Sequence, residues 1–139
     1  MKRIFYLLLL TLTIAGCNNK KSFTIYGIIK GKTEKTIYLN RVDVNTPVLI
    51  DSAKINKKGR FRFKIPASEP DFYQLGFSKT NFVTLLAEPQ EKITITFSGQ
   101  DLYDNYTISG SAGSSKLQML DASLAETKRK LDSLSTVYN

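Results

Sequence analysis

The chain holds few of the side chains that carry most protein chemistry. It has one cysteine, Cys17, and no histidine among its 139 residues. A single thiol cannot form a disulfide within the chain or a Cys-x-x-Cys redox pair, and the usual Cys/His metal sites are excluded. A nucleophilic serine would need a lysine as its base, and no Ser-x-x-Lys stands in a context that suggests an active site. We therefore expect no enzyme, no catalytic residue, no cofactor and no metal.

Acidic residues form two close pairs, Glu88 with Glu91 and Asp101 with Asp104. Paired carboxylates are typical of general acid–base sites. Both pairs lie in loop-like sequence, and two carboxylates are too few for a calcium site. We interpret them as solvated loop charge.

A basic run stands in the middle of the chain and consists of Lys54, Lys57, Lys58, Arg60, Arg62 and Lys64. It is suited to anionic headgroups or lipopolysaccharide phosphates, since each cation near an anionic membrane surface contributes about 1 kcal/mol. The alternation of the run with apolar residues explains it more simply as the solvated face and turn of one hairpin. We favour the second interpretation.

The N-terminal residues have the layout of a secretory signal. Lys2 and Arg3 precede an apolar stretch over residues 4–14 that is too short to span a bilayer stably. The following Ile14-Ala15-Gly16-Cys17 resembles the lipobox of bacterial lipoproteins, in which the peptide is cut between the residues corresponding to Gly16 and Cys17 and the thiol is diacylated. Dual acylation is a stable anchor because each buried CH₂ contributes about 0.8 kcal/mol. An ordinary secretory signal with a chance cysteine is the alternative.

The predicted cleavage removes residues 1–16 and leaves 123 residues with a net charge of about +6 in place of +8. That length suits one domain with a modest core. Residues 17–22 become the lipidated cysteine and a polar tether, so membrane lipid is the expected partner and nucleic acid is not. In Gram-negative bacteria, an aspartate directly after the cysteine would resemble the inner-membrane retention signal, and acidic residues just after the cysteine would resemble surface-export signals. Both are missing, which favours the inner leaflet of the outer membrane, facing the periplasm.

Residues 23–112 predict an antiparallel β-sandwich, or a flattened barrel, of about seven to eight short strands. Alternation is clearest where Phe61, Phe63 and Ile65 share one face. Residues 48–55 and 60–65 are expected to form a hairpin around Asn56-Lys57-Lys58-Gly59, with Gly59 in the left-handed position of the turn. The other expected strands begin near Phe23, Thr36, Phe72, Phe82, Ile93 and Tyr106.

Residues 113–139 predict an amphipathic helix after a flexible break at 110–114, with Ser114 or Ser115 as its cap. Its apolar residues recur at alternating spacings of three and four and form the seam Leu117, Leu120, Leu124, Thr127, Leu131, Leu134 and Tyr138. The favoured interpretation is that this seam packs on the sandwich or on a following domain. A self-associating or partner-binding coiled coil is the alternative.

The order of several short segments carries a family resemblance. They are Phe23-Thr24-Ile25-Tyr26-Gly27, Thr36-Ile37-Tyr38-Leu39, Ile50-Asp51-Ser52-Ala53, Tyr73-Gln74-Leu75, Leu85-Leu86-Ala87-Glu88-Pro89 and Ile108-Ser109-Gly110-Ser111. Together they resemble the β-rich domain of unknown function that precedes thioredoxin-like, AhpC/TSA-type domains in many envelope lipoproteins. The resemblance implies a fold and an envelope setting. The redox activity of those relatives belongs to a Cys-x-x-Cys domain that this sequence lacks.

The sequence thus predicts a lipid-anchored, periplasm-facing binding or spacer module without catalytic activity. One alternative is the N-terminal part of a thiol-disulfide oxidoreductase lipoprotein without its thioredoxin-like domain. Another is a module that binds a partner or itself through the C-terminal helix.

Overall fold

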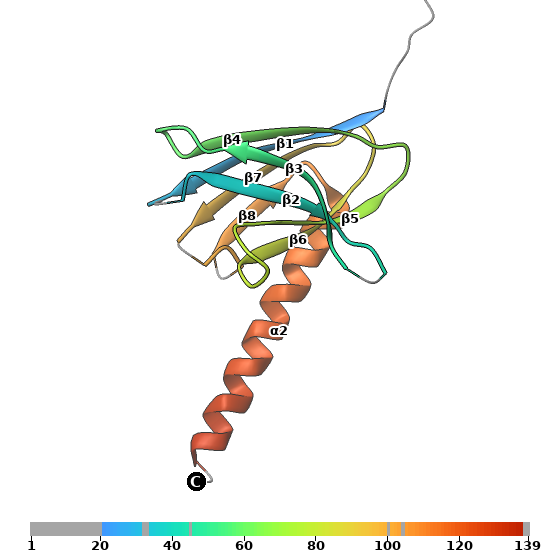
Figure 1. Cartoon of the computed structure of the whole chain (residues 1–139). Coiled ribbons are helices and arrows are strands. Elements are labelled where there is room, and N and C mark those ends of the chain that lie inside the picture. Colours follow the sequence, from blue (N-terminus) through green and yellow to red (C-terminus); the bar gives the residue numbers. More distant parts are fainter. Residues whose placement is uncertain (1–20, 32–33, 45, 100, 104, 138–139) are drawn as a thin grey trace, which may run out of the picture.

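The computed structural model describes residues 21–31, 34–44, 46–99, 101–103 and 105–137. The predicted signal peptide, Cys17, Asp104 and Tyr138 lie outside the described residues. Two four-stranded sheets pack face to face, and one long helix leaves them at one side (Figure 1). The elements are β1 (Ser22–Lys30), β2 (Thr36–Arg41), β3 (Val48–Lys54), β4 (Arg60–Pro66), β5 (Asp71–Gly76), β6 (Phe82–Ala87), β7 (Lys92–Ser98), β8 (Tyr106–Ser109) and α2 (Ala112–Val137).

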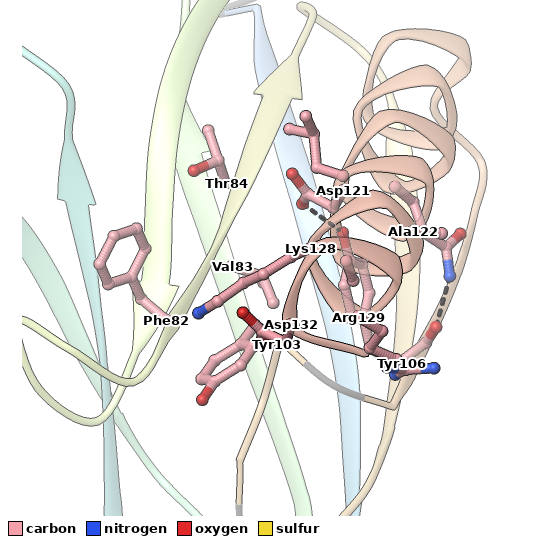
Figure 2. A pocket seen from close by; sticks show the side chains of 13 residues that line it. Phe82, Val83, Thr84, Tyr103, Tyr106, Asp121, Ala122, Lys128, Arg129 and Asp132 are labelled. Atoms are coloured by element: carbon pink, nitrogen blue, oxygen red, sulfur yellow. Dashed lines mark hydrogen bonds between the residues drawn. The ribbon is translucent and has the colours of Figure 1, made fainter. Parts of the chain in front are cut away.

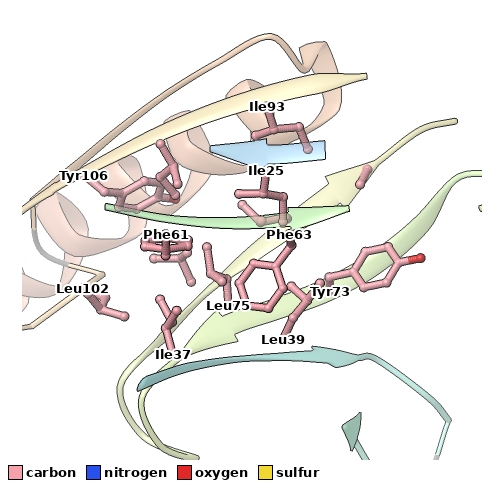
Figure 3. Packing of buried hydrophobic residues seen from close by; sticks show 14 of the residues in the cluster. Ile25, Ile37, Leu39, Phe61, Phe63, Tyr73, Leu75, Ile93, Leu102 and Tyr106 are labelled. Atoms are coloured by element: carbon pink, nitrogen blue, oxygen red, sulfur yellow. The ribbon is translucent and has the colours of Figure 1, made fainter. Parts of the chain in front are cut away.

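The alternating strands bury one face each and together make the core (Figure 3). In β4, Phe61, Phe63 and Ile65 are buried while the basic residues between them are exposed, which confirms the predicted alternation. Phe23 of β1 and Tyr73 of β5 join the two sheets, with ring centroids 4.9 Å apart. The predicted mainly β sandwich of about seven to eight short strands with a C-terminal helix is confirmed, and the strands number eight in the described residues.

The strand order corrects one part of the prediction. The sheets run β4-β1-β7-β8 and β3-β2-β5-β6. Strand β1 pairs antiparallel with β4 but parallel with β7, so the sandwich is not wholly antiparallel. A parallel pair needs a long crossover, and here five strands separate β1 from β7 along the chain: β2, β3, β5 and β6 of the other sheet, and β4 on the far side of β1.

The predicted hairpin between β3 and β4 is wrong, although its turn is right. Gly59 has φ 74°, and its amide donates to the Asn56 carbonyl at 2.9 Å. Beyond the turn the two strands separate, because β3 pairs with β2 in one sheet and β4 pairs with β1 in the other. The turn therefore closes one side of the sandwich by linking the edges of its two sheets.

The core leaves room for one aromatic ring only because the neighbouring strand carries glycine. A Cβ added at buried Gly27 would lie 1.9 Å from Cζ of Phe61, its register partner on β4. We predict that Gly27→Ala lowers the free energy of unfolding by about 1–3 kcal/mol, since overpacking forces the ring to move.

Urea denaturation measures this effect, and Gly99→Ala is the control because nothing lies within 4 Å of a Cβ there. In the double variant with Phe61→Leu, the smaller leucine side chain should reduce the loss in free energy of unfolding that Gly27→Ala causes. Equal losses for Gly27→Ala and Gly99→Ala would contradict the close approach.

Candidate functional site: the helix at the open side of the sandwich

The side of the sandwich opposite the β3–β4 turn is bounded by β6 of one sheet and β8 of the other, and helix α2 packs against both. Strand β6 is an edge, so part of its backbone faces outward without a neighbouring strand. The Ser114 hydroxyl donates to the Leu86 carbonyl at 2.8 Å and accepts from the Leu86 amide at 3.1 Å. Ser111 donates to the same carbonyl at 3.0 Å. Two serine side chains therefore take the place of a strand at this point.

The same serines begin the helix. The Ser111 hydroxyl accepts from the Ser114 amide at 3.2 Å, which is the bond that an N-cap residue makes, and the helix starts at Ala112. The cap is thus Ser111, and the prediction of Ser114 or Ser115 is wrong. Residues 110–114 are no loose break either, because Ser111 and Ser114 are 4% and 1% exposed. The helix begins where its side chains can reach the edge of β6.

One helical turn further on, α2 is bonded to the other sheet. The Gln118 side chain donates to the Tyr106 carbonyl of β8, and the Tyr106 hydroxyl donates to Asp121 Oδ2 at 3.1 Å. Burial, with the neighbouring Asp121 carboxylate, raises the pKa of Tyr106 above its ordinary value. Tyr106 therefore stays a neutral hydrogen-bond donor, and the helix is held to both sheets.

The helix contacts both sheets through a polar stripe that no prediction from the sequence contained, formed by Ser111, Ser114, Gln118 and Asp121. Their spacing of three, four and three is helical, so the signal was present. A search for apolar residues at helical spacing does not find such a stripe, because its hydroxyl and amide groups are polar. A run of small polar residues at helical spacing after a last strand is the pattern that points to such a contact.

The apolar seam lies on a different face from this polar stripe, which corrects the prediction that the seam packs on the sandwich. Leu120, Leu124, Leu131 and Leu134 are 54–62% exposed, and Leu117 is half-buried. At about 100° per residue, the centres of the two faces are roughly 120° apart around the helix. Tyr138 lies outside the described residues. The helix thus binds its own domain with one stripe and presents leucines on another.

An open groove of about 760 Å³ runs between the helix and the sandwich where the two diverge (Figure 2). Phe82 and Tyr103 contribute aromatic rings to its lining, and Lys128 and Arg129 contribute positive charge. The bond from Tyr106 to Asp121 lies within it. This lining can contact an apolar or anionic group. The Tyr106 hydroxyl and the Asp121 carboxylate, which also line the groove, are bonded to each other and hold the helix.

The remaining sequence candidates have structural roles or are exposed. The Glu91 carboxylate accepts from the Glu88 amide at 2.9 Å and so closes the loop before β7. Asp101 is exposed, and the cations of the basic run are exposed on β3, β4 and their turn, as predicted for a solvated face. Arg62 also lies over the Tyr26 ring, 5.1 Å from its centroid. Within the described ranges, no group of three or more acidic, histidine or cysteine side chains is placed to hold a metal ion.

Two sequence families match the chain. The family described as "Domain of unknown function (DUF4369)" matches residues 23–117, which span both sheets and the start of the helix. The chain belongs to this family. The family described as "Prokaryotic membrane lipoprotein lipid attachment site" matches residues 1–18, so the DUF4369 protein carries a lipid attachment signal and is a membrane-anchored protein of the cell envelope. No curated protein matches the sequence. In the part of the chain that the structure describes, no helix has the length and apolar character needed to cross a bilayer.

Removal of the Ser114 hydroxyl tests the contact with β6. We predict that Ser114→Ala lowers the free energy of unfolding by about 1–3 kcal/mol, because the partly buried Leu86 amide is left without this partner. Ser123→Ala is the matched control, since that hydroxyl bonds within the exposed part of the same helix and its loss should change stability by less than about 0.5 kcal/mol. Similar effects of both changes in urea denaturation would refute the contact.

The Tyr106 hydroxyl makes a prediction for alkaline pH. Its pKa is raised by folding, so the unfolded chain loses this proton first and the free energy of unfolding falls as the pH rises above 10.0, the ordinary pKa of tyrosine. Tyr106→Phe should be less stable at neutral pH but should lose less further stability between about pH 9 and pH 11. Urea denaturation at both pH values measures the difference, with Tyr103→Phe as a control at an exposed tyrosine. Parallel declines in the unmodified chain and Tyr106→Phe would sink the assignment.

Proposed function

We propose that this DUF4369 protein is a lipid-anchored, non-catalytic binding or spacer module that faces the periplasm, with its lipid on Cys17. The observation that carries the proposal is the lipid attachment signal over residues 1–18, which contains the chain's only cysteine. Strand β1 begins at Ser22, five positions after Cys17. Five extended residues reach at most about 17 Å, so the anchor holds one end of the sandwich close to the bilayer.

The strand directions support a defined orientation on that membrane. Ser22 pairs with Pro66 and Ile28 with Arg60, so the turn with Lys57 and Lys58 lies at the end remote from the anchor. These two cations then point away from the anchoring bilayer, which disfavours their use on its headgroups. The helix starts near Leu86 at the anchored end and leaves the sandwich, so that its C-terminal end lies far from the N-terminal end of β1 (Figure 1).

The structural hydrogen bonds made by the titratable side chains support a non-catalytic role. Tyr106 and Asp121 are bonded to each other across the helix contact, and Glu91 holds its own loop. The structural use of these groups favours a module that binds or spaces. Its one long element, about 39 Å of helix, extends away from the anchor.

The exposed seam favours a second candidate function, in which the helix binds a partner protein. The leucines from Leu120 to Leu134 are more than half exposed along this helix, and contiguous apolar surface of this kind marks interaction sites.

The thiol-disulfide alternative concerns sequence beyond Asn139. Under it, the DUF4369 domain is the front module of a longer redox lipoprotein, and the DNA downstream of the reading frame encodes a Cys-x-x-Cys domain. Ordinary intergenic DNA at that place would remove this alternative.

Substitution of the lipidated residue tests the anchor. We predict that Cys17→Ser abolishes incorporation of radiolabelled palmitate and moves the protein from the membrane fraction to the soluble fraction, because no acyl chain is attached. Ser22→Ala, at the last residue of the tether and the first of β1, is the control and should remain labelled and in the membrane fraction. Retention of Cys17→Ser in washed membranes would contradict the proposal.

A further inference from the structure

We propose that a second copy of this chain covers the leucine seam, and that the two helices form a parallel, in-register, two-stranded coiled coil. The proposal names the partner for the exposed helix, and its parallel orientation rests on the proposed lipid anchor. Three observations support the dimer: the repeat of the seam, the charges that flank the seam, and the position of the sandwich on another face of the helix.

The seam has the repeat of a coiled coil. Leu117, Leu124 and Leu131 occupy its a positions, and Leu120 and Leu134 occupy d positions. Thr127 takes the remaining d position within the described residues. Its hydroxyl donates to the Ser123 carbonyl at 2.9 Å, so the polar group is satisfied inside its own helix and the methyl group remains for the seam.

The flanking charges are complementary between two copies of the chain. In a parallel pair, a g residue of one helix faces the e residue five positions later in the other. Lys116 of one copy then meets Asp121 of the second, and the symmetric contact repeats the pair. The next such pair joins Ser123 to Lys128, so no like charges face each other at these described positions. Asp121 holds Tyr106 through Oδ2, and its carboxylate has a second oxygen for the lysine.

The sandwich stands clear of the second copy. Its hydrogen bonds go to the helix face that contains Ser114 and Gln118, and the centre of this face is roughly 120° from that of the seam, of which Leu124 also lines the open groove. A twofold axis along the seam therefore directs the two sandwiches away from each other. An isolated helix gains little from its own side chains, and in this exposed part Glu126 forms an ion pair with Lys130 at 2.7 Å. Association supplies the apolar burial that the seam lacks.

A common membrane selects the parallel arrangement. Two copies that are anchored near Ser22 in the same leaflet send their helices away from the bilayer in the same direction. Anchoring also raises the local concentration, so a short seam is enough to associate.

The test uses the full lipidated chain in washed membranes under mild oxidation. In Leu120→Cys the two introduced sulfurs meet across a parallel, in-register seam, and we expect a disulfide-linked dimer. The control is Met119→Cys, which is 71% exposed on another face of the helix and should give about tenfold less dimer. Addition of Leu131→Lys to Leu120→Cys should reduce the dimer by about tenfold, because a charge is placed in the seam, whereas addition of Met119→Lys should not.

The outcomes separate this inference from the proposed function. Membrane-bound chains with no more disulfide in Leu120→Cys than in Met119→Cys overturn the dimer and leave the anchor standing. Chains found in the soluble fraction instead overturn the anchor. Disulfides that form only when Leu120→Cys and Leu131→Cys chains are mixed overturn the parallel arrangement, because those positions meet in an antiparallel pair.

Discussion

The backbone of Leu86 at the edge of β6 needs hydrogen-bond partners, and the rest of the architecture depends on how it finds them. Ser114 supplies both a donor and an acceptor, and Ser111 adds a second donor. Because Ser111 also caps the helix, a single pair of serines ends the sheet and begins α2. An exposed edge is a template for unwanted pairing, and here it is covered by a helix that continues far beyond it.

This contact determines which face of the helix is available to other molecules. Once Ser114 and Gln118 are directed at the two sheet edges, the leucines from Leu120 to Leu134 are left more than half exposed. Stability of the domain and the surface it presents are therefore carried by different stripes of the same helix. Changes to the leucines can alter association while the sandwich remains intact.

The strand faces could be read from the chain, whereas the strand partners could not. Phe61, Phe63 and Ile65 alternate with charged residues, and burial of an apolar face is local information with a period of two. The parallel pairing of β1 with β7 joins residues about seventy positions apart, and no local pattern encodes it. The β3–β4 turn shows the limit clearly, because Gly59 adopts the predicted conformation while the strands beside it enter different sheets.

The buried strand faces, the leucine seam and the position of the lipid attachment signal could all be predicted from the sequence, since each is a repeat or motif of neighbouring residues. The exposure of the seam, and the hydrogen bonds that hold the helix through Ser111, Ser114, Gln118 and Asp121, could be recognised in the folded chain alone. An amphipathic pattern records which residues avoid water, whereas the helix here is positioned largely by backbone groups of β6 and β8 that lack strand partners. Every sequence has these backbone groups, so the ones that lack a hydrogen-bond partner are known only once the edges of the two sheets are placed.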